Sequence, residues 1–374
     1  VGRHRSLKVH IENRAPKLYT LNCPCHLISL CALKAASSLL VNGDEVLIRV
    51  FYYLDKSARW KHLLKEHAEF VNVEHRKILK HSGTHWGKRI DRILMIMPTL
   101  RLFFQSEDLE KKRQNRDVCD FVCSPKTELY LLFISSAIAV FEDVNKVLQY
   151  EAPIIPMVHG SLMELLRKVM IEFIRTEVLT EASSLLATDY SDVNNQVPNR
   201  DLFIGFATKQ YLLRTVELTE SQITVLYSNL RNFYPTAVKY IVKKFPLNYP
   251  ILTFAGFLDY SHHQQYSLNN VITLIQHLIS SFCMYQPLNI DTTTMDSCRE
   301  GGLRPDILWH EISKFPILTK LAKLVLTLPH SNANTEHLFR MVENKTDLRS
   351  SLSAETLCSL LKMKTNCFKA TACY

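Results

Sequence analysis

The sequence predicts a mainly α-helical protein, and three observations carry this prediction. The 374 residues include nine glycines, which is few for a fold rich in tight turns. Apolar residues make up 47% of the chain, enough for a large core and for two or three domains. In most long segments these residues recur at the three- and four-residue spacing of a helix with one buried face.

Four segments show this pattern most clearly. Long helices are expected over residues 126–149 and 158–182, the first apolar and the second amphipathic. Residues 223–245 continue the pattern with an interruption near Pro235, and residues 268–283 form a further buried helix. The longest apolar run is interrupted by serines and too short to span a bilayer, so no membrane partner is expected.

Charge and cysteine content narrow the function classes. Lys and Arg number 45 against 36 Asp and Glu, which gives a net charge of +9 and suits an acidic partner such as nucleic acid. Ten cysteines are spread over the whole length rather than clustered as in a small secreted domain, so reduced thiols in an intracellular protein are expected. No P-loop, dinucleotide fingerprint or Ser/His/Asp array is present.

The most informative stretch is residues 328–366, which predicts two helices joined by a polar, basic turn. Ser353 is placed to cap the second helix, with Glu355 in its first turn. Neither helix is long enough to be stable alone, so both must dock on the rest of this chain or on a second copy. Their apolar stripes are Leu338, Met341 and Val342 in the first helix, and Leu357, Leu360 and Leu361 in the second.

The order PHSNA, TEHLF, TDLRSSL and a leucine-rich helix resembles the C-terminal dimerisation region of hAT-family DNA transposases. The family pattern has Ser-Glu-Arg where this chain has Thr335-Glu336-His337, and it usually has Ser at the position of Arg340. The resemblance implies a homodimer or higher oligomer. The residues expected to form its interface are Leu338, Phe339, Met341, Val342, Leu352, Leu357, Leu360 and Leu361.

Glu336 is the acidic residue that the resemblance singles out. In the family, the matching Glu is the third carboxylate of a metal-binding Asp-Asp-Glu set. Glu336 points away from the apolar stripe of its own helix, and a surface ion pair with Arg340 would also explain it. A two-metal site needs several carboxylates, so Glu336 is expected to be catalytic only if two aspartates precede it upstream.

The sequence Cys23-Pro24-Cys25-His26 suggests a zinc site, but no second ligand pair lies nearby. Cys23 and His26 match a Cys-x-x-His signature that hAT transposases carry beside their active site. In the family both catalytic aspartates lie upstream of this signature, and this chain starts at about that point. The resemblance therefore implies that both aspartates are absent here and that residues 18–22 are a strand left from the core.

Residues 46–98 are basic and aromatic, and cations that bind phosphates beside rings that stack on bases are typical of DNA-binding surfaces. Thr84-His85-Trp86 resembles the family's Thr-Arg-Trp, whose Trp stacks on a displaced base. The expected DNA contacts are Trp86, His85, Lys88 and Arg89. Helical spacing alone favours the alternative of a solvated amphipathic helix pair with buried aromatic residues.

The resemblance implies an all-helical insertion domain joined to an incomplete RNase H-like α/β core. Residues 1–40 are then a remnant of that core, residues 41–299 the insertion domain, and residues 300–374 the dimerisation region with the last core helix. A polar linker with prolines and adjacent glycines at 286–305 agrees with the second boundary.

The resemblance implies a transposase-derived protein that associates with itself and binds DNA in the nucleus. Without the resemblance, the protein would be expected in the cytoplasm. It is expected to lack strand-cleaving activity, to need no cofactor and to have no metal site within this chain alone. One alternative is the C-terminal part of an active transposase that cuts DNA with Mg²⁺ or Mn²⁺. Another is a helical interaction scaffold that does not bind DNA.

Overall fold

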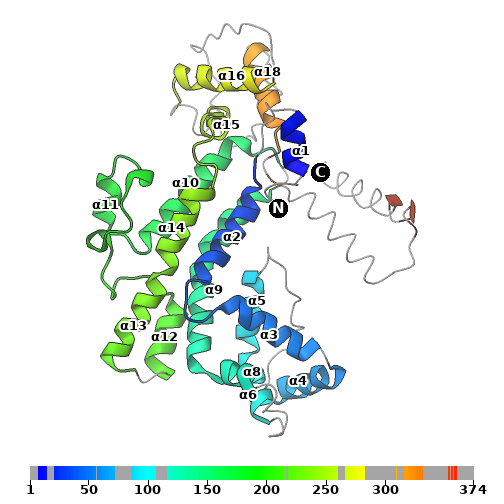
Figure 1. Ribbon diagram of the computed structural model, residues 1–374, viewed down its shortest axis with the longest axis vertical. Helices are drawn as coiled ribbons and strands as arrows, with labels where there is room; N and C mark the ends of the chain where they lie inside the picture. The colour runs from blue at the N-terminus through cyan, green and yellow to red at the C-terminus, as the bar shows by residue number, and fades with distance from the viewer. Residues whose placement is uncertain are drawn as a thin grey trace. The chain divides into compact units, whose positions relative to one another are not determined.

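The computed structural model describes residues 7–14, 21–55, 57–71, 86–106, 116–150, 152–215, 218–259, 266–282, 309, 316–329, 331, 353, 355–356 and 358–359. Within these ranges the backbone forms helices and turns without a β-strand, and an isolated antiparallel bridge joins Ile174 to Gln196 (Figure 1). The prediction of a mainly α-helical protein is confirmed. The RNase H-like core stays a prediction, because residues 18–20 of its expected strand lie outside the described ranges and residues 21 and 22 are in no strand.

Contacts between residues divide the chain into two compact units. One consists of residues 1–25, 148–156 and 257–374, and the other of residues 26–147 and 157–256. The second unit contains most of the described residues and the segments discussed below.

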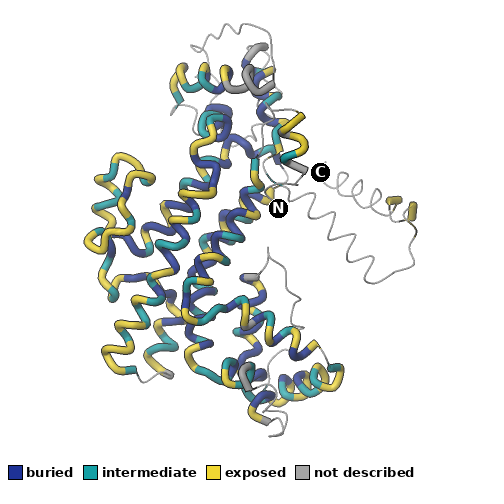
Figure 2. Tube along the Cα trace, viewed as in Figure 1, coloured by how far each residue is buried: buried dark blue, intermediate teal, exposed yellow. Residues whose placement is uncertain are grey.

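Four long helices make the core of this second unit: α2 (Pro24–Ala36), α9 (Pro125–Leu148), α10 (Ile155–Ile171) and α14 (Phe233–Lys244). Buried and exposed residues alternate along each helix, as helical periodicity requires (Figure 2). The Cys31 thiol of α2 donates to the Ala237 carbonyl of α14 over 3.5 Å, which brings these two helices side by side.

Aromatic rings fill the space between α9, α14 and the end of α10. The Phe133 ring packs edge-on against Phe233 with centroids 5.6 Å apart, and Phe173 stacks on Tyr234 at 5.7 Å. The Tyr234 hydroxyl donates to the Phe203 carbonyl over 2.7 Å, so this buried polar group is satisfied. Such large rings bury much apolar area and pack α9, α14 and the end of α10 against one another.

Five further helices form a lobe of the same unit: α3 (Gly43–Asp55), α4 (Ala58–Phe70), α5 (Trp86–Met95), α6 (Met97–Ser106) and α8 (Arg116–Cys123). α3 contacts α4, α5 and α8, while α6 contacts the same three helices.

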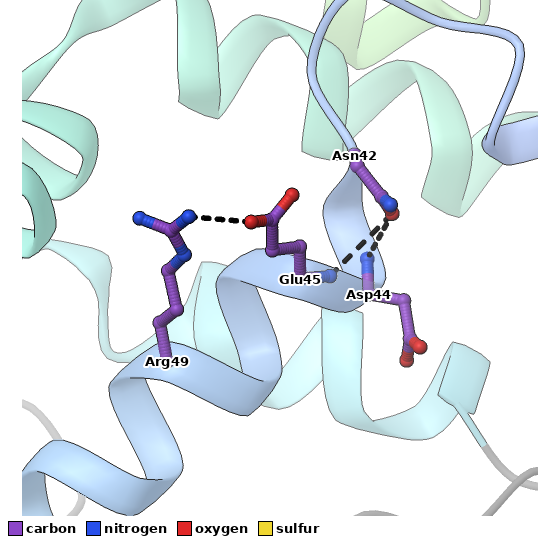
Figure 3. A network of polar contacts seen from close by, with 4 residues as sticks. All are labelled: Asn42, Asp44, Glu45 and Arg49. Atoms are coloured by element: carbon purple, nitrogen blue, oxygen red, sulfur yellow. Dashed lines mark hydrogen bonds and ion pairs between the residues drawn. The ribbon is translucent and has the colours of Figure 1, made fainter.

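The start of α3 shows how local chemistry fixes this lobe. The Asn42 side chain accepts hydrogen bonds from the Asp44 and Glu45 amides at 3.2 and 3.4 Å (Figure 3). These bonds satisfy amides that a helix start leaves without a partner. The Glu45 carboxylate forms an ion pair with Arg49, one turn further along α3, at 2.5 Å. The capped start leaves the Asp44 carboxylate to face α5.

The prediction of one helix over residues 158–182 is wrong. α10 ends at Ile171, and a separate helix, α11 (Thr176–Glu181), follows after a turn. At this break the backbone bonds to a distant segment. The Val197 amide donates to the Phe173 carbonyl over 2.9 Å, and the Arg175 amide donates to the Asn195 carbonyl over 2.9 Å. Two 3₁₀ turns, η1 (Leu185–Ala187) and η2 (Val193–Asn195), follow α11 in the chain.

α12 (Phe206–Thr215) starts directly after Gly205, whose φ of 82° and close approach to Ser136 suit only glycine. α13 (Glu220–Arg231) begins with a capping box between Thr219 and Gln222. The expected interruption near Pro235 lies at Asn232, between α13 and α14, so Pro235 falls in the first turn of α14, where proline is tolerated.

The unit closes with α15 (Pro250–Ala255). In the first unit the described elements are α1 (Leu7–Arg14), α16 (Leu268–Phe282), α18 (Pro316–Leu326) and the end of η3 (Gly256–Leu258). There the buried Trp309 indole donates to the Leu258 carbonyl over 3.1 Å.

Candidate functional site

The start of α5 is the first candidate, because four predicted DNA contacts gather there. Trp86 is the first residue of α5, but its side chain and all of His85 lie outside the described residues. Lys88 is exposed, as a phosphate contact requires. The Arg89 side chain is only 4% exposed, and its Nη2 lies 3.3 Å from the Asp44 carboxylate of α3. This buried ion pair gives Arg89 a structural role, so the DNA-binding prediction for α5 now depends on its exposed side.

The surroundings of Lys88 reduce its attraction for phosphate. Gly87 packs against the Glu142 carboxylate of α9, and Asp91, one turn on, accepts a hydrogen bond from the Ser135 hydroxyl over 2.5 Å. Burial raises the pKa of Glu142, the Asp91 charge raises it further, and Lys146 and Lys88 oppose the shift. Lys88 therefore lies in the field of two carboxylates, which offset part of its positive charge.

The aromatic residues upstream of α5 serve the core. The Tyr53 ring is buried and stacks on the Trp60 ring with centroids 4.4 Å apart. Tyr53 also packs against Phe104 of α6 at 5.1 Å. Tyr52 is exposed. For Tyr53 and Trp60 the structure thus shows the alternative interpretation, an amphipathic helix pair whose aromatic residues pack inward.

α14 carries a basic face that was not predicted from the sequence. Lys239, Lys243 and Lys244 are all exposed, and Lys239 and Lys243 lie one helical turn apart. No ion pair to these three lysines occurs among the described residues. The sequence KYIVKK could have indicated this face, because it places three lysines at helical spacing within an otherwise apolar helix.

The predicted Cys-x-x-His signature lies at the start of α2. Cys25 is buried, Cys23 is half-buried and His26 is exposed. Across the described ranges, no group of three or more His, Cys, Asp or Glu side chains is arranged to hold a metal ion. No described helix is long and apolar enough to cross a membrane.

In the second half of the C-terminal stretch, residues 345–366, five positions are described. Ser353, Glu355, Thr356, Cys358 and Ser359 are all exposed. The Ser353 hydroxyl accepts a hydrogen bond from the Thr356 amide over 3.2 Å, which is the predicted helix cap. Glu336 and all the predicted interface residues lie outside the described residues: Leu338, Phe339, Met341, Val342, Leu352, Leu357, Leu360 and Leu361.

Comparison with known families identifies this stretch. Residues 306–367 match the hAT family C-terminal dimerisation region, a range that contains Glu336 and every predicted interface residue. Comparisons with curated proteins and with solved structures give no match. Residues 306–367 of this chain are thus identified as an hAT family C-terminal dimerisation region.

Proposed function

We propose that this chain associates with itself through its C-terminal helices, binds DNA through exposed lysines, and does not cut DNA by itself. The observation that carries the proposal is the match of residues 306–367 to a dimerisation region. Association and DNA binding use different parts of the chain, so they can be tested separately.

Amphipathicity supports self-association. The five described residues of the last helical stretch present polar or small side chains to solvent. The sequence places Leu357, Leu360 and Leu361 at helical spacing between them. Because helices this short are marginal alone, burial of the leucines against a second copy would supply the missing stabilisation.

Sedimentation equilibrium of the purified chain tests this step. The wild-type chain is expected to form dimers or larger oligomers at micromolar concentration. The double variant Leu357→Glu, Leu361→Glu should raise the dissociation constant at least about 100-fold, because it places charges where the proposed interface would bury two leucines. The matched control is Leu213→Glu on α12, where the leucine is 80% exposed outside the matched region. Unchanged oligomer mass in the double variant would contradict the proposed interface.

Charge supports DNA binding. The chain has a net charge of +9, and the three α14 lysines are exposed without an ion pair in the described part of the chain. Lysines that neutralise phosphates release counterions, and this term does not depend on base sequence. We therefore expect DNA binding without strong sequence preference through α14, with Lys88 and Trp86 of α5 as further contacts. From the resemblance to hAT transposases, we propose that the protein is nuclear.

Fluorescence anisotropy with a labelled duplex measures this binding over a range of salt concentrations. Lys239→Glu, Lys243→Glu should weaken binding and lower the slope of log affinity against log salt by about 2, close to 0.9 for each lost phosphate contact. Lys88→Glu should have a smaller effect. The control is Lys168→Glu on α10, a lysine 3.9 Å from Glu164. Absence of binding even at low salt would favour the scaffold without DNA binding.

We expect no DNA cleavage because the resemblance identifies too few metal-binding carboxylates in this chain. Of the three metal-binding carboxylates of the family, Glu336 alone has a counterpart in this chain, whereas in-line transfer with two metal ions needs several. The purified chain is expected to leave supercoiled plasmid intact in Mg²⁺ or Mn²⁺. Nicking that Glu336→Gln abolishes would instead establish the active-transposase alternative, with residues 1–40 as part of an RNase H-like core.

A further inference from the structure

An apolar pocket of about 280 Å³ lies within the second unit, where the turn after α2 meets the first turns of α9 and α13. Its volume is close to the lower end of the range for small-molecule sites, about 300–1,000 Å³. The lining residues that matter for recognition are Leu40, Lys126, Leu129, Tyr130, Val225 and Leu226. Among the described residues that line it, none comes from α14.

One side chain holds the three walls together. The Asn229 amide oxygen accepts hydrogen bonds from the Leu40 backbone amide over 3.0 Å and from the Tyr130 hydroxyl over 2.8 Å. The turn, α9 and α13 are therefore linked through a single residue of α13. Burial raises the pKa of Tyr130 to about 12, so its hydroxyl stays neutral and remains a donor to Asn229. The pocket is built before any ligand arrives.

The surface of the pocket is apolar and open to solvent at its rim. Leu129 is buried in the wall, whereas Leu40 is 73% exposed and Val225 is 62% exposed. Two large aliphatic side chains at the mouth of one pocket would gain free energy if an apolar group covered them. An aliphatic or aromatic ligand body fits this lining, and a strongly polar one does not.

Lys126 is the charged side chain among the described residues that line the pocket. Lys126 is exposed and has no ion pair among the described residues. It lies in the first turn of α9, and Ser221 lies in the first turn of α13, so two helices direct their positive ends toward the same pocket. The acidic residue Glu128 in the first turn of α9 is bound to Arg101 at 2.6 Å, which offsets its charge.

We propose that this pocket binds a small amphipathic anion, with an apolar body about the size of a medium-length acyl chain and one carboxylate. The apolar body lies against Leu129, Val225 and Leu226, and the carboxylate pairs with the Lys126 ammonium group. This binding is independent of self-association and of DNA binding.

Isothermal titration calorimetry with decanoate, below its micelle-forming concentration, tests the proposal on the full chain. Decanol serves as the uncharged probe of the same length. We expect saturable binding of one decanoate per chain and at least about threefold weaker binding of decanol, which is a small ion-pair contribution. Lys126→Gln should reduce decanoate affinity to the level of decanol and leave decanol binding unchanged.

A second pair of variants tests the location. Val225→Gln should weaken both probes about tenfold, since it replaces an apolar rim residue by a neutral polar one. Val193→Gln is the control, because Val193 is 76% exposed and does not line the pocket. The proposal is wrong if decanoate binding is not saturable, if decanol binds equally well, or if Val225→Gln and Val193→Gln behave alike. Circular dichroism of each variant establishes that the helices are intact.

Discussion

α5 and α14 both carry basic side chains and belong to the same unit, but these side chains have different surroundings. In α5 the Arg89 guanidinium is buried against Asp44, and Lys88 lies near Glu142 and Asp91. In α14 the lysines project from a helix whose opposite face is in the aromatic core. The first helix uses cations to join elements of the fold, and the second leaves them at the surface.

This difference shows that net charge overstates the charge available to a partner. A buried guanidinium already has a carboxylate partner, and removing it from that partner to bind phosphate would be costly. An exposed lysine loses only water and weakly bound ions when it meets a phosphate. We therefore expect different results when basic residues of the two helices are replaced. Replacing Arg89 of α5 should change the stability of the fold, whereas replacing the lysines of α14 should change DNA binding.

The largest expected effect is at Arg89. Arg89→Met should lower the free energy of unfolding by about 3–5 kcal/mol, because it removes the guanidinium beside the Asp44 carboxylate, which is only 15% exposed. Urea denaturation followed by circular dichroism measures this change. The double variant Arg89→Met, Asp44→Asn should recover part of the loss, since a neutral amide then replaces the buried carboxylate.

The matched comparison is the α14 pair. Lys239→Glu, Lys243→Glu should change the free energy of unfolding by no more than about 0.5 kcal/mol, as expected for exposed positions. If this variant lost as much stability as Arg89→Met, the distinction between structural and available charge would not hold.

A smaller effect is expected where α5 meets α9. Ser135→Ala removes the hydroxyl that donates to Asp91 and should cost about 1 kcal/mol in the same denaturation experiment. Ser136→Ala is a close control, because the Ser136 hydroxyl donates to the Leu132 carbonyl of its own helix. Equal stability of the two variants would show that the Ser135 contact does not help to hold α5 in place.

Periodicity in the sequence was sufficient for the long helices and insufficient for their ends. The expected helices over 126–149 and 268–283 correspond closely to α9 (Pro125–Leu148) and α16 (Leu268–Phe282). Both are set by local apolar spacing. The end of α10 could not be predicted, because the break after Ile171 depends on backbone bonds to residues 195–197, more than 20 positions away.

The candidate sites also differ in how far the sequence alone could predict them. The dimerisation motif was recognisable because its residues are contiguous in sequence, and the family comparison confirms the identification. Lys88 and Arg89 are adjacent, and neighbours on a helix point in different directions. Which of them is buried depends on Asp44, 45 positions away, so sequence alone could not separate them. The pocket beside α13 was missed because its walls come from three separate segments.

The smallest expected effect is a pH dependence at the α5–α9 contact. Burial and the nearby Asp91 raise the pKa of Glu142 above its usual value of 4.5, while Lys146 and Lys88 oppose the shift and Asp143 adds to it. The folded chain thus holds this proton more tightly than the unfolded chain does. The resulting stabilisation is complete below pH 4.5 and is lost as pH rises through the folded-state pKa. Glu142→Gln should remove this decline, so urea denaturation between pH 4.5 and 7 should show wild-type stability falling relative to the variant. Parallel pH profiles would mean that solvent screens the carboxylate and that α5 is held chiefly by Arg89.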